Sequence, residues 1–243
     1  MKIAAMIPAR YAATRFPGKL MQLLGGKTVI RYTYEATAAT GLFDEVLVVT
    51  DSDIIFTEIT AAGGTAIMSR NEHESGSDRI AEAAADMEMD IIVNVQGDTP
   101  FVKREPLQKL IQQFDDPAVQ VASMMQEMKN PEDIVNPNKV KVVVDNKMNS
   151  LFFSRSVIPY TREAKHAAVY YEHIGVYAYR RQVLLNFTQW PVTPLESAEK
   201  IECLRYLENG IQLRMAEVDY MGIGIDTPED LEQANKFLQG YCL

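Results

Sequence analysis

A buried strand is predicted by the apolar run Ile3-Ala4-Ala5-Met6-Ile7, which is followed directly by Pro8. Three further runs of aliphatic and β-branched residues have the same character, and the segments between them show the apolar spacing of helices. The predicted strands are 3–7, 45–50, 65–68 and 91–95, and the predicted helices are 28–40, 53–62, 78–87 and 105–114. Strands that alternate with helices in this way indicate βαβ units and a mostly parallel sheet.

The second half of the chain loses this strict alternation. Longer strands are predicted there, and the segment 170–179 is rich in Tyr, which suits a sheet face open to water or a subunit contact. The predicted strands are 119–125, 140–144, 170–179 and 211–218, and the predicted helices are 194–208 and 228–238. The sequence therefore predicts one α/β domain over 1–243, in which a core of residues 1–120 and 211–243 carries a mixed-sheet lobe of residues 121–210.

The charge of the chain is unevenly distributed. It has 24 Lys and Arg against 33 Asp and Glu, and this acidic balance argues against general nucleic-acid binding. Residues 1–34 nevertheless contain six bases and no acid. Three of these bases, Arg10, Arg15 and Lys19, follow the first predicted strand in one loop. Clustered cations of this kind favour a polyphosphate such as a triphosphate, and the alternative is a solvated basic loop.

Composition limits the protein class further. With 47% hydrophobic residues the chain can bury a sizeable core. No apolar run approaches the roughly 18 residues of a membrane span, and the first apolar run meets Pro8 too early for a signal peptide. We therefore expect a cytoplasmic protein without a membrane segment. The two cysteines, Cys203 and Cys242, have no C-x-x-C spacing, so free thiols are expected.

Ligands of parallel sheets bind at the carboxyl ends of the strands, so the loops after the predicted strands are the candidate sites. Asp51 follows the second strand and can also cap the next helix. The polar loop 73–79 follows the third strand; it suits a base edge or a phosphate, with helix capping as the alternative. Asp98 follows the fourth strand, and Asp226 precedes the last helix, which it can also cap. Together these two carboxylates form a plausible magnesium site.

Two familiar phosphate-binding loops are excluded by counting. Gly26-Lys27-Thr28 resembles the end of a Walker A loop, but Met21 stands where that loop needs its first glycine. Gly222-Ile223-Gly224 offers two glycines of a dinucleotide fingerprint, but Thr227 stands where the third is required. No nucleophile triad is visible.

Several segments, in order over nearly the whole chain, closely resemble the 3-deoxy-manno-octulosonate (Kdo) cytidylyltransferases, or CMP-Kdo synthetases. These segments are 7–19, Ser75-Gly76-Ser77-Asp78-Arg79, Asn94-Val95-Gln96-Gly97-Asp98, 153–160, 173–180, 194–196 and 226–230. The resemblance implies a nucleotide-diphospho-sugar transferase fold, which is Rossmann-like, and a homodimer that uses Mg²⁺, CTP and Kdo. It also implies attack of the anomeric hydroxyl of Kdo on the α-phosphorus of CTP, giving CMP-Kdo for lipopolysaccharide synthesis and pyrophosphate.

The resemblance also implies roles for individual residues. Arg10, Lys19 and Asp98 would be catalytic, and Asp98 and Asp226 would bind the metal. The implied nucleotide-binding residues are Pro8, Ala9, Arg10, Arg15, Lys19, Ser75, Gly76, Ser77, Arg79 and Gln96. The implied sugar-binding residues, in the lobe that would also form the dimer, are Arg155, Tyr160, His173, Tyr177, Glu196 and Glu202. For His173 the alternative is a core histidine with its hydrogen bonds satisfied.

The chain departs from the common family pattern at three places. Thr99 stands where an acid follows Asp98, Leu20-Met21 stands where a proline is usual, and Thr50-Asp51-Ser52 replaces a common Thr-Asp-Asp. None of these departures touches Arg10 or Lys19. A related sugar acid, such as 8-amino-Kdo or a sialic acid, would fit the same chemistry. A nucleotide-binding regulator that has lost activity is the alternative from another functional class.

Overall fold

The computed structural model describes residues 1–12, 16–71, 73, 75–163, 168–219 and 224–240. The chain forms two compact units, Met1–Arg104 with Met221–Leu243, and Glu105–Tyr220. The predicted core and lobe have other bounds, because that division was made at the change of pattern after about residue 120. The assignment of the nucleotide to 1–120 and 211–243, and of the sugar to 121–210, stays a prediction.

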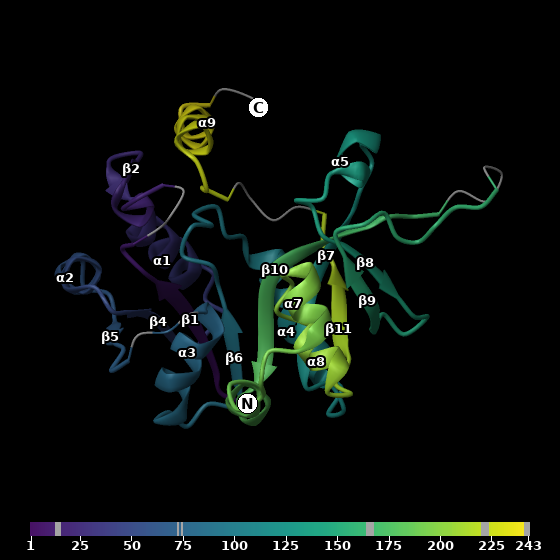
Figure 1. Ribbon diagram of the computed structural model, residues 1–243. Coiled ribbons are helices and arrows are strands. Elements are labelled where there is room, and N and C mark those ends of the chain that lie inside the picture. Colours follow the sequence, from purple (N-terminus) through teal and green to yellow (C-terminus); the bar gives the residue numbers. More distant parts are fainter. Residues whose placement is uncertain (13–15, 72, 74, 164–167, 220–223, 241–243) are drawn as a thin grey trace. The chain divides into compact units, whose positions relative to one another are not determined.

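The first unit is built on parallel strands, as the alternation of elements predicts. They are β1 (Ile3–Ala9), β4 (Glu45–Thr50), β5 (Ala66–Met68) and β6 (Ile91–Asn94), in the order β6-β1-β4-β5 (Figure 1). In the register of this sheet, Met6 of β1 lies opposite Leu47 on one side and Asn94 on the other. β1 is therefore central among these strands and is buried along nearly its whole length. The loop that carries Arg10 begins at the end of β1.

Helices α1 (Val29–Ala39), α2 (Asp53–Ala61) and α3 (Gly76–Ala85) contact these strands, and α9 (Pro228–Leu238) contacts β2. Thr28 and Ser75 cap α1 and α3 through their hydroxyl oxygens. A hairpin of β2 (Leu23–Leu24) and β3 (Lys27–Thr28), which follows the 3₁₀ turn η1 (Lys19–Met21), was not predicted. Its turn is Gly25-Gly26, and both residues have positive φ, which glycine adopts without strain.

The second unit has a mixed sheet, in agreement with the predicted change of pattern. β10 (Tyr171–Arg180) runs antiparallel to β7 (Val121–Glu127) and β8 (Lys141–Val144), β8 pairs with β9 (Ser150–Ser154), and β11 (Leu213–Glu217) is parallel to β7. The other elements are α4 (Arg104–Gln112), η2 (Gln113–Asp115), α5 (Pro131–Val135), α6 (Arg181–Phe187), α7 (Pro194–Glu199) and α8 (Leu204–Glu208). An aromatic core packs against β10, where Tyr179 stacks on Tyr206 and the ring centres of Phe187 and Tyr206 are 4.4 Å apart.

The predicted continuous helix 194–208 is wrong. The structure has two helices, α7 and α8, because Lys200 ends α7 in the left-handed conformation with φ of 54°. A helix cannot continue through a left-handed residue, so the chain turns before α8 begins. The strand β9 and the short helices α5 and α6 were not predicted.

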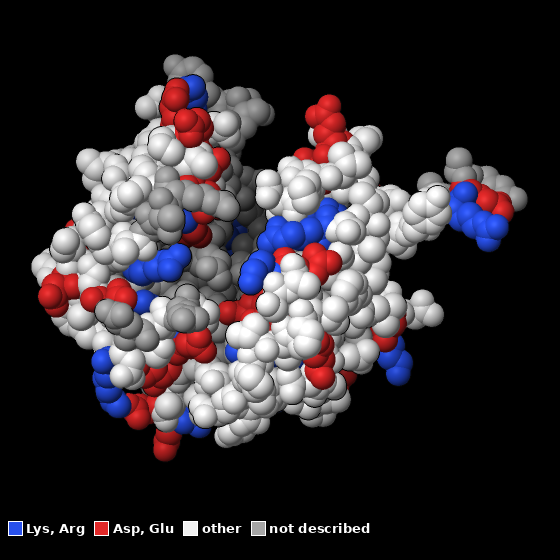
Figure 2. All heavy atoms as spheres, viewed as in Figure 1, with Lys and Arg blue, Asp and Glu red and all other residues white. Residues whose placement is uncertain are grey.

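Two basic residues of the segment 1–34 that have no predicted ligand role are paired with an acid that directly follows this segment. Lys27 and Arg31 both contact the carboxylate of Glu35, at 2.5 and 2.8 Å. Basic and acidic side chains both occur across the face shown in Figure 2. Among the described residues, no helix combines the length and the apolar character that crossing a membrane requires.

Candidate functional site

The first unit contains a cavity of about 390 Å³ that collects residues from the ends of β1 and β6, from η1 and from the start of α3. Ten of its lining residues are among the predicted nucleotide and metal residues: Pro8, Ala9, Arg10, Lys19, Ser75, Gly76, Arg79, Gln96, Asp98 and Asp226. The lining residues that were not predicted are Phe16, Leu20, His73 and Gly97. Ser77 is buried in α3 and is not among the lining residues, and Arg15 lies outside the described residues.

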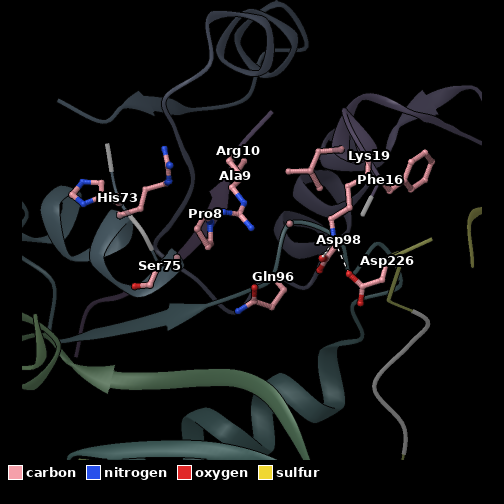
Figure 3. A pocket seen from close by; sticks show the side chains of 14 residues that line it. Pro8, Ala9, Arg10, Phe16, Lys19, His73, Ser75, Gln96, Asp98 and Asp226 are labelled. Atoms are coloured by element: carbon pink, nitrogen blue, oxygen red, sulfur yellow. Dashed lines mark hydrogen bonds and ion pairs between the residues drawn. The ribbon is translucent and has the colours of Figure 1, made fainter. Parts of the chain in front are cut away.

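At one end of the cavity the ammonium group of Lys19 lies between two carboxylates. Its Nζ is 2.5 Å from Oδ2 of Asp98 and 2.8 Å from Oδ1 of Asp226, and the three side chains point toward one another in Figure 3. Burial opposes the charge of Lys19, but the two carboxylates outweigh it and raise the lysine pKa above its usual value. This arrangement is a cation held by two acids that are 128 residues apart in sequence.

Asp226 does not cap α9, so the capping alternative for this residue is wrong. The N-cap is Thr227, whose hydroxyl accepts from the amide of Asp230 while the carboxylate of Asp230 accepts from the amide of Thr227. Because this capping box satisfies the helix end, the side chain of Asp226 is available to pair with Lys19.

Asp51 does not cap α2 either. The N-cap position is occupied by Ser52, whose side chain makes no capping bond. The carboxylate of Asp51 instead accepts a 2.7 Å hydrogen bond from Nη2 of Arg79, and Nη1 of Arg79 donates to Ser69. Arg79 is almost fully buried, so these two bonds fix its guanidinium at the wall of the cavity.

The loop before α3 combines capping with a place at the cavity. The hydroxyl of Ser75 accepts from the amide of Asp78 at 3.0 Å and donates to the carboxylate of Asp78 at 2.8 Å. The predicted capping alternative is therefore confirmed for Ser75, which also lines the cavity. The next residue, Gly76, approaches Pro8 so closely that a Cβ would lie 3.1 Å from the proline ring.

In the second unit, Glu196 is engaged by another side chain. Its carboxylate accepts hydrogen bonds of 2.7 and 2.5 Å from Nε and Nη2 of Arg205, and both residues are 8% exposed. The guanidinium also lies over the ring of Phe187, 4.2 Å from its centre. Glu196 was predicted from the resemblance to bind the sugar; in the structure it forms a buried ion pair.

Arg155 and Tyr160 differ in how far they are already engaged. The guanidinium of Arg155 donates to the carbonyls of Glu199, Pro137 and Lys200 at 2.7, 3.0 and 3.3 Å. Tyr160 is 87% exposed. Arg155 is thus held by backbone acceptors, whereas the ring of Tyr160 lies in solvent.

His173 and Tyr177 project from β10 into a polar and aromatic cluster. Nε2 of His173 lies 3.0 Å from Oγ of Ser123, and the imidazole meets the rings of Phe153 and Tyr177 edge-on. Tyr177 is hydrogen-bonded to the thiol of Cys203, and burial raises the pKa of both groups. Cys203 is a free thiol as predicted, whereas Cys242 lies outside the described residues. Glu202, the remaining predicted sugar residue, is half-buried beside Cys203.

Comparison with known proteins gives the family. The chain matches the Cytidylyltransferase family model over residues 4–217. It is 58% identical over 242 residues to a 3-deoxy-manno-octulosonate cytidylyltransferase of Flavobacterium johnsoniae, with 98% of this chain and 99% of the relative covered. It is 53% identical over 240 residues to the protein of the same name from Christiangramia forsetii, with 98% and 97% covered. The chain belongs to the 3-deoxy-manno-octulosonate cytidylyltransferase family.

The fold is that of the family as well. A solved CMP:2-keto-3-deoxy-manno-octonic acid synthetase, complexed with CTP, is similar with a TM-score of 0.95 and 41% identity, and 99% of each chain is covered. The predicted mixed α/β fold with a largely parallel central sheet is thereby confirmed.

His73 also lines the cavity, and no role was predicted for it from the sequence. Its Nε2 lies 2.8 Å from the carboxylate of Glu82, which also accepts from the amide of Arg70 and from Asn71. Glu82 on α3 therefore ties the loop that carries His73 to the helix behind it. The polar loop was recognised, but its imidazole could not be told from its other polar groups, because the anchoring acid follows nine residues later inside a helix.

We expect Gly97→Ala to lower the free energy of unfolding by about 1–3 kcal/mol, because the position has no room for a methyl group. A Cβ there would lie 3.1 Å from the carbonyl oxygen of Pro8 and 3.2 Å from Cδ1 of Ile30, and the Pro8 carbonyl belongs to the paired strand β1. Urea unfolding checks this. Gly175→Ala is the matched control, since no atom of the described residues other than its chain neighbours lies within 4 Å of its Cβ position. Equal stability losses in the two variants would contradict the prediction.

We expect acid to destabilise the protein through His173. Burial lowers the pKa of this imidazole from 6.5 to about 4, so between these values the unfolded chain binds a proton that the folded chain does not. The free energy of unfolding therefore falls as the pH drops from 6.5 toward 4, by roughly 3 kcal/mol from this residue. Urea unfolding at pH 7 and pH 4 should show this loss in the wild type and not in His173→Gln. The same pH dependence in both proteins would refute the assignment.

Proposed function

We propose that this chain transfers the cytidylyl group of CTP to 3-deoxy-D-manno-octulosonate, giving CMP-Kdo for lipopolysaccharide synthesis and pyrophosphate. The observation that carries the proposal is the cavity in which Lys19, Asp98 and Asp226 converge beside Arg10. Two carboxylates beside the cations of Arg10 and Lys19 suit a metal–triphosphate complex. The relatives named above support the choice of CTP and of the sugar acid. A cytoplasmic location belongs to the same proposal, because CTP is found there.

Magnesium is part of this proposal, with Asp98 and Asp226 as the residues that would hold it. The donor set fits, because the two carboxylates already share one cation, the ammonium of Lys19. Among the described residues no group of three or more acidic, His or Cys side chains gathers around a common point. Mg²⁺ often binds through one or two carboxylates and takes its other ligands from phosphate and water, so two carboxylates are sufficient. When bound, Mg²⁺ would neutralise charge on the phosphates.

The residues of the chain would then act by binding and orientation. Arg10 and Lys19 would hold the triphosphate, with Lys19 exchanging its carboxylate partners for phosphate oxygens. Ala9, Ser75, Gly76 and Gln96 would surround the cytidine at the other wall of the cavity. The anomeric hydroxyl oxygen of the sugar forms the new bond to the α-phosphorus, the bond to the β-phosphate breaks, and the hydroxyl proton passes to solvent. Arg10 and Lys19 would stabilise the negative charge that develops on the leaving pyrophosphate.

The test is pyrophosphate release from CTP in the presence of Kdo, with and without a chelator. We expect release that needs both substrates and stops on chelation. The same assay with 8-amino-Kdo and a sialic acid ranks the sugar acids by kcat/KM, and the highest value identifies the substrate. Folded protein that binds CTP and releases no pyrophosphate with any of these acids would overturn the proposal and favour an inactive regulator.

We further propose a homodimer, supported by apolar side chains that the second unit leaves exposed. Leu151 on the edge strand β9 is 56% exposed, and Tyr160 and Val169 beyond it are 87% and 53% exposed. A second copy that covers these side chains would remove them from water. Sedimentation should give twice the mass of the 27.3 kDa chain, and Leu151→Asp should shift the protein toward monomer. Val192→Asp, at an exposed apolar position elsewhere, is the control. A wild type of monomer mass would refute the proposal.

A further inference from the structure

An irregularity in β10 brings two backbone carbonyls and one imidazole to a single buried hydroxyl. The pairing of β10 with β7 shifts register between Ile174 and Tyr177. Opposite this shift, Oγ of Ser123 lies 3.1 Å from the carbonyl oxygen of Ile174 and 2.9 Å from that of Val176. The same oxygen is 3.0 Å from Nε2 of His173. Ser123 is fully buried, so these groups must satisfy one another.

The count of protons decides the direction of each bond. A serine hydroxyl has one hydrogen to donate and two lone pairs, whereas a carbonyl oxygen can only accept. If the hydrogen pointed to His173, both carbonyls would face lone pairs of Oγ at hydrogen-bond distance. If it points to a carbonyl, only one such contact remains, and the lone pair toward the imidazole is free to accept. Nε2 of His173 is then the donor and must carry the ring proton.

We propose that Ser123 is a positioning residue that holds His173 in the Nε2–H tautomer and leaves Nδ1 as a fixed hydrogen-bond acceptor. The ring cannot easily turn, because Phe153 and Tyr177 pack against it with ring centres 4.8 and 5.4 Å away. The residue keeps partial exposure, and among the described residues the only hydrogen bond of its ring is the one through Nε2. Nδ1 is therefore the nitrogen left for a ligand.

The tautomer determines which chemical groups of a ligand His173 can bind, and this step rests on the proposed function. A neutral ring nitrogen with a free lone pair accepts from a hydroxyl and repels a carboxylate. His173 would therefore select a hydroxyl of the sugar acid and not its carboxylate. Ser123 acts through His173 and touches no substrate in this scheme. Its removal should weaken sugar binding and leave CTP binding unchanged.

The first experiment needs no substrate. Nitrogen-detected NMR of ¹⁵N-histidine-labelled protein at pH 7 reports which ring nitrogen carries the proton, and His173→Gln identifies the signal. We expect the proton on Nε2 in the wild type. A proton on Nδ1, or rapid exchange between the two forms, would overturn the proposal. Because no sugar is present, this result stands even if Kdo proves not to be the substrate.

The second experiment compares two variants by kinetics. We expect Ser123→Ala to raise the KM for the sugar acid about tenfold, with an unchanged KM for CTP, and to lose the single Nε2–H form in the NMR spectrum. Ser123→Thr keeps the hydroxyl and should restore both readouts. Thermal unfolding confirms that each variant is folded. If folded Ser123→Ala keeps the wild-type tautomer and sugar KM, or if both KM values change together, Ser123 is only structural.

Discussion

Asp98→Asn is expected to lower kcat for cytidylyl transfer by roughly 10²–10³-fold or more while the protein folds normally. The change keeps the size of the side chain and removes one of the two carboxylates that face Lys19. With one carboxylate fewer, the site loses half of the negative charge that would bind a divalent cation. Pyrophosphate release at saturating CTP and sugar acid measures the effect. Circular dichroism and thermal unfolding report the fold.

The fold should survive because Asp98 contributes to it mainly through its backbone. Its carbonyl oxygen accepts from the amide of Ile225 at 2.9 Å, a bond that asparagine keeps. Asp53→Asn, an exposed acid in the first turn of α2, is the control and should turn over like the wild type. Wild-type turnover in Asp98→Asn would remove Asp98 from the metal site.

Arg205→Met is expected to lower the free energy of unfolding by about 3–5 kcal/mol, the largest stability effect that we predict. The substitution leaves the carboxylate of Glu196 buried without a partner and removes the guanidinium from the ring of Phe187. Urea unfolding measures the loss. Lys236→Met is the control; it removes one partner of an exposed pair with Glu232, and we expect a change below about 1 kcal/mol.

The double variant Glu196→Gln with Arg205→Met tests the reason for this loss. If an uncompensated charge is responsible, removing that charge should restore part of the stability that Arg205→Met loses. A loss below about 1 kcal/mol in the single variant would show that water reaches Glu196 after the substitution.

The fold of the first unit could be predicted because each strand is a short apolar run with a polar loop after it. The ion pair of Glu196 could not. In the predicted continuous helix, Glu196 and Arg205 stand nine positions apart, and at 3.6 residues per turn they lie on opposite faces of the helix. Only the break at Lys200 allows α8 to present Arg205 to α7. The left-handed conformation of Lys200 cannot be recognised from the apolar periodicity of the sequence. It nevertheless determines the environment of Glu196, a predicted sugar-binding residue.

The candidate site was predicted where its residues follow strands, and missed where they do not. Asp98 could be placed because it follows a buried strand of the parallel sheet, and Asp226 was paired with it because two carboxylates suit a magnesium ion. Ser123 lies inside β7, and a buried serine in a strand carries no pattern that distinguishes it from a packing residue. Its importance depends on the register shift in β10, which periodicity does not reveal.

The ammonium of Lys19 between Asp98 and Asp226 also has a thermodynamic consequence. A divalent cation that binds there without a nucleotide must separate Lys19 from both carboxylates and leave the ammonium without a partner. When a triphosphate is present, Lys19 gains new partners as it loses the old ones. Binding of the two ligands is then coupled with a favourable free energy, and the coupling is reciprocal. CTP should raise the affinity for magnesium by the same factor as magnesium raises the affinity for CTP.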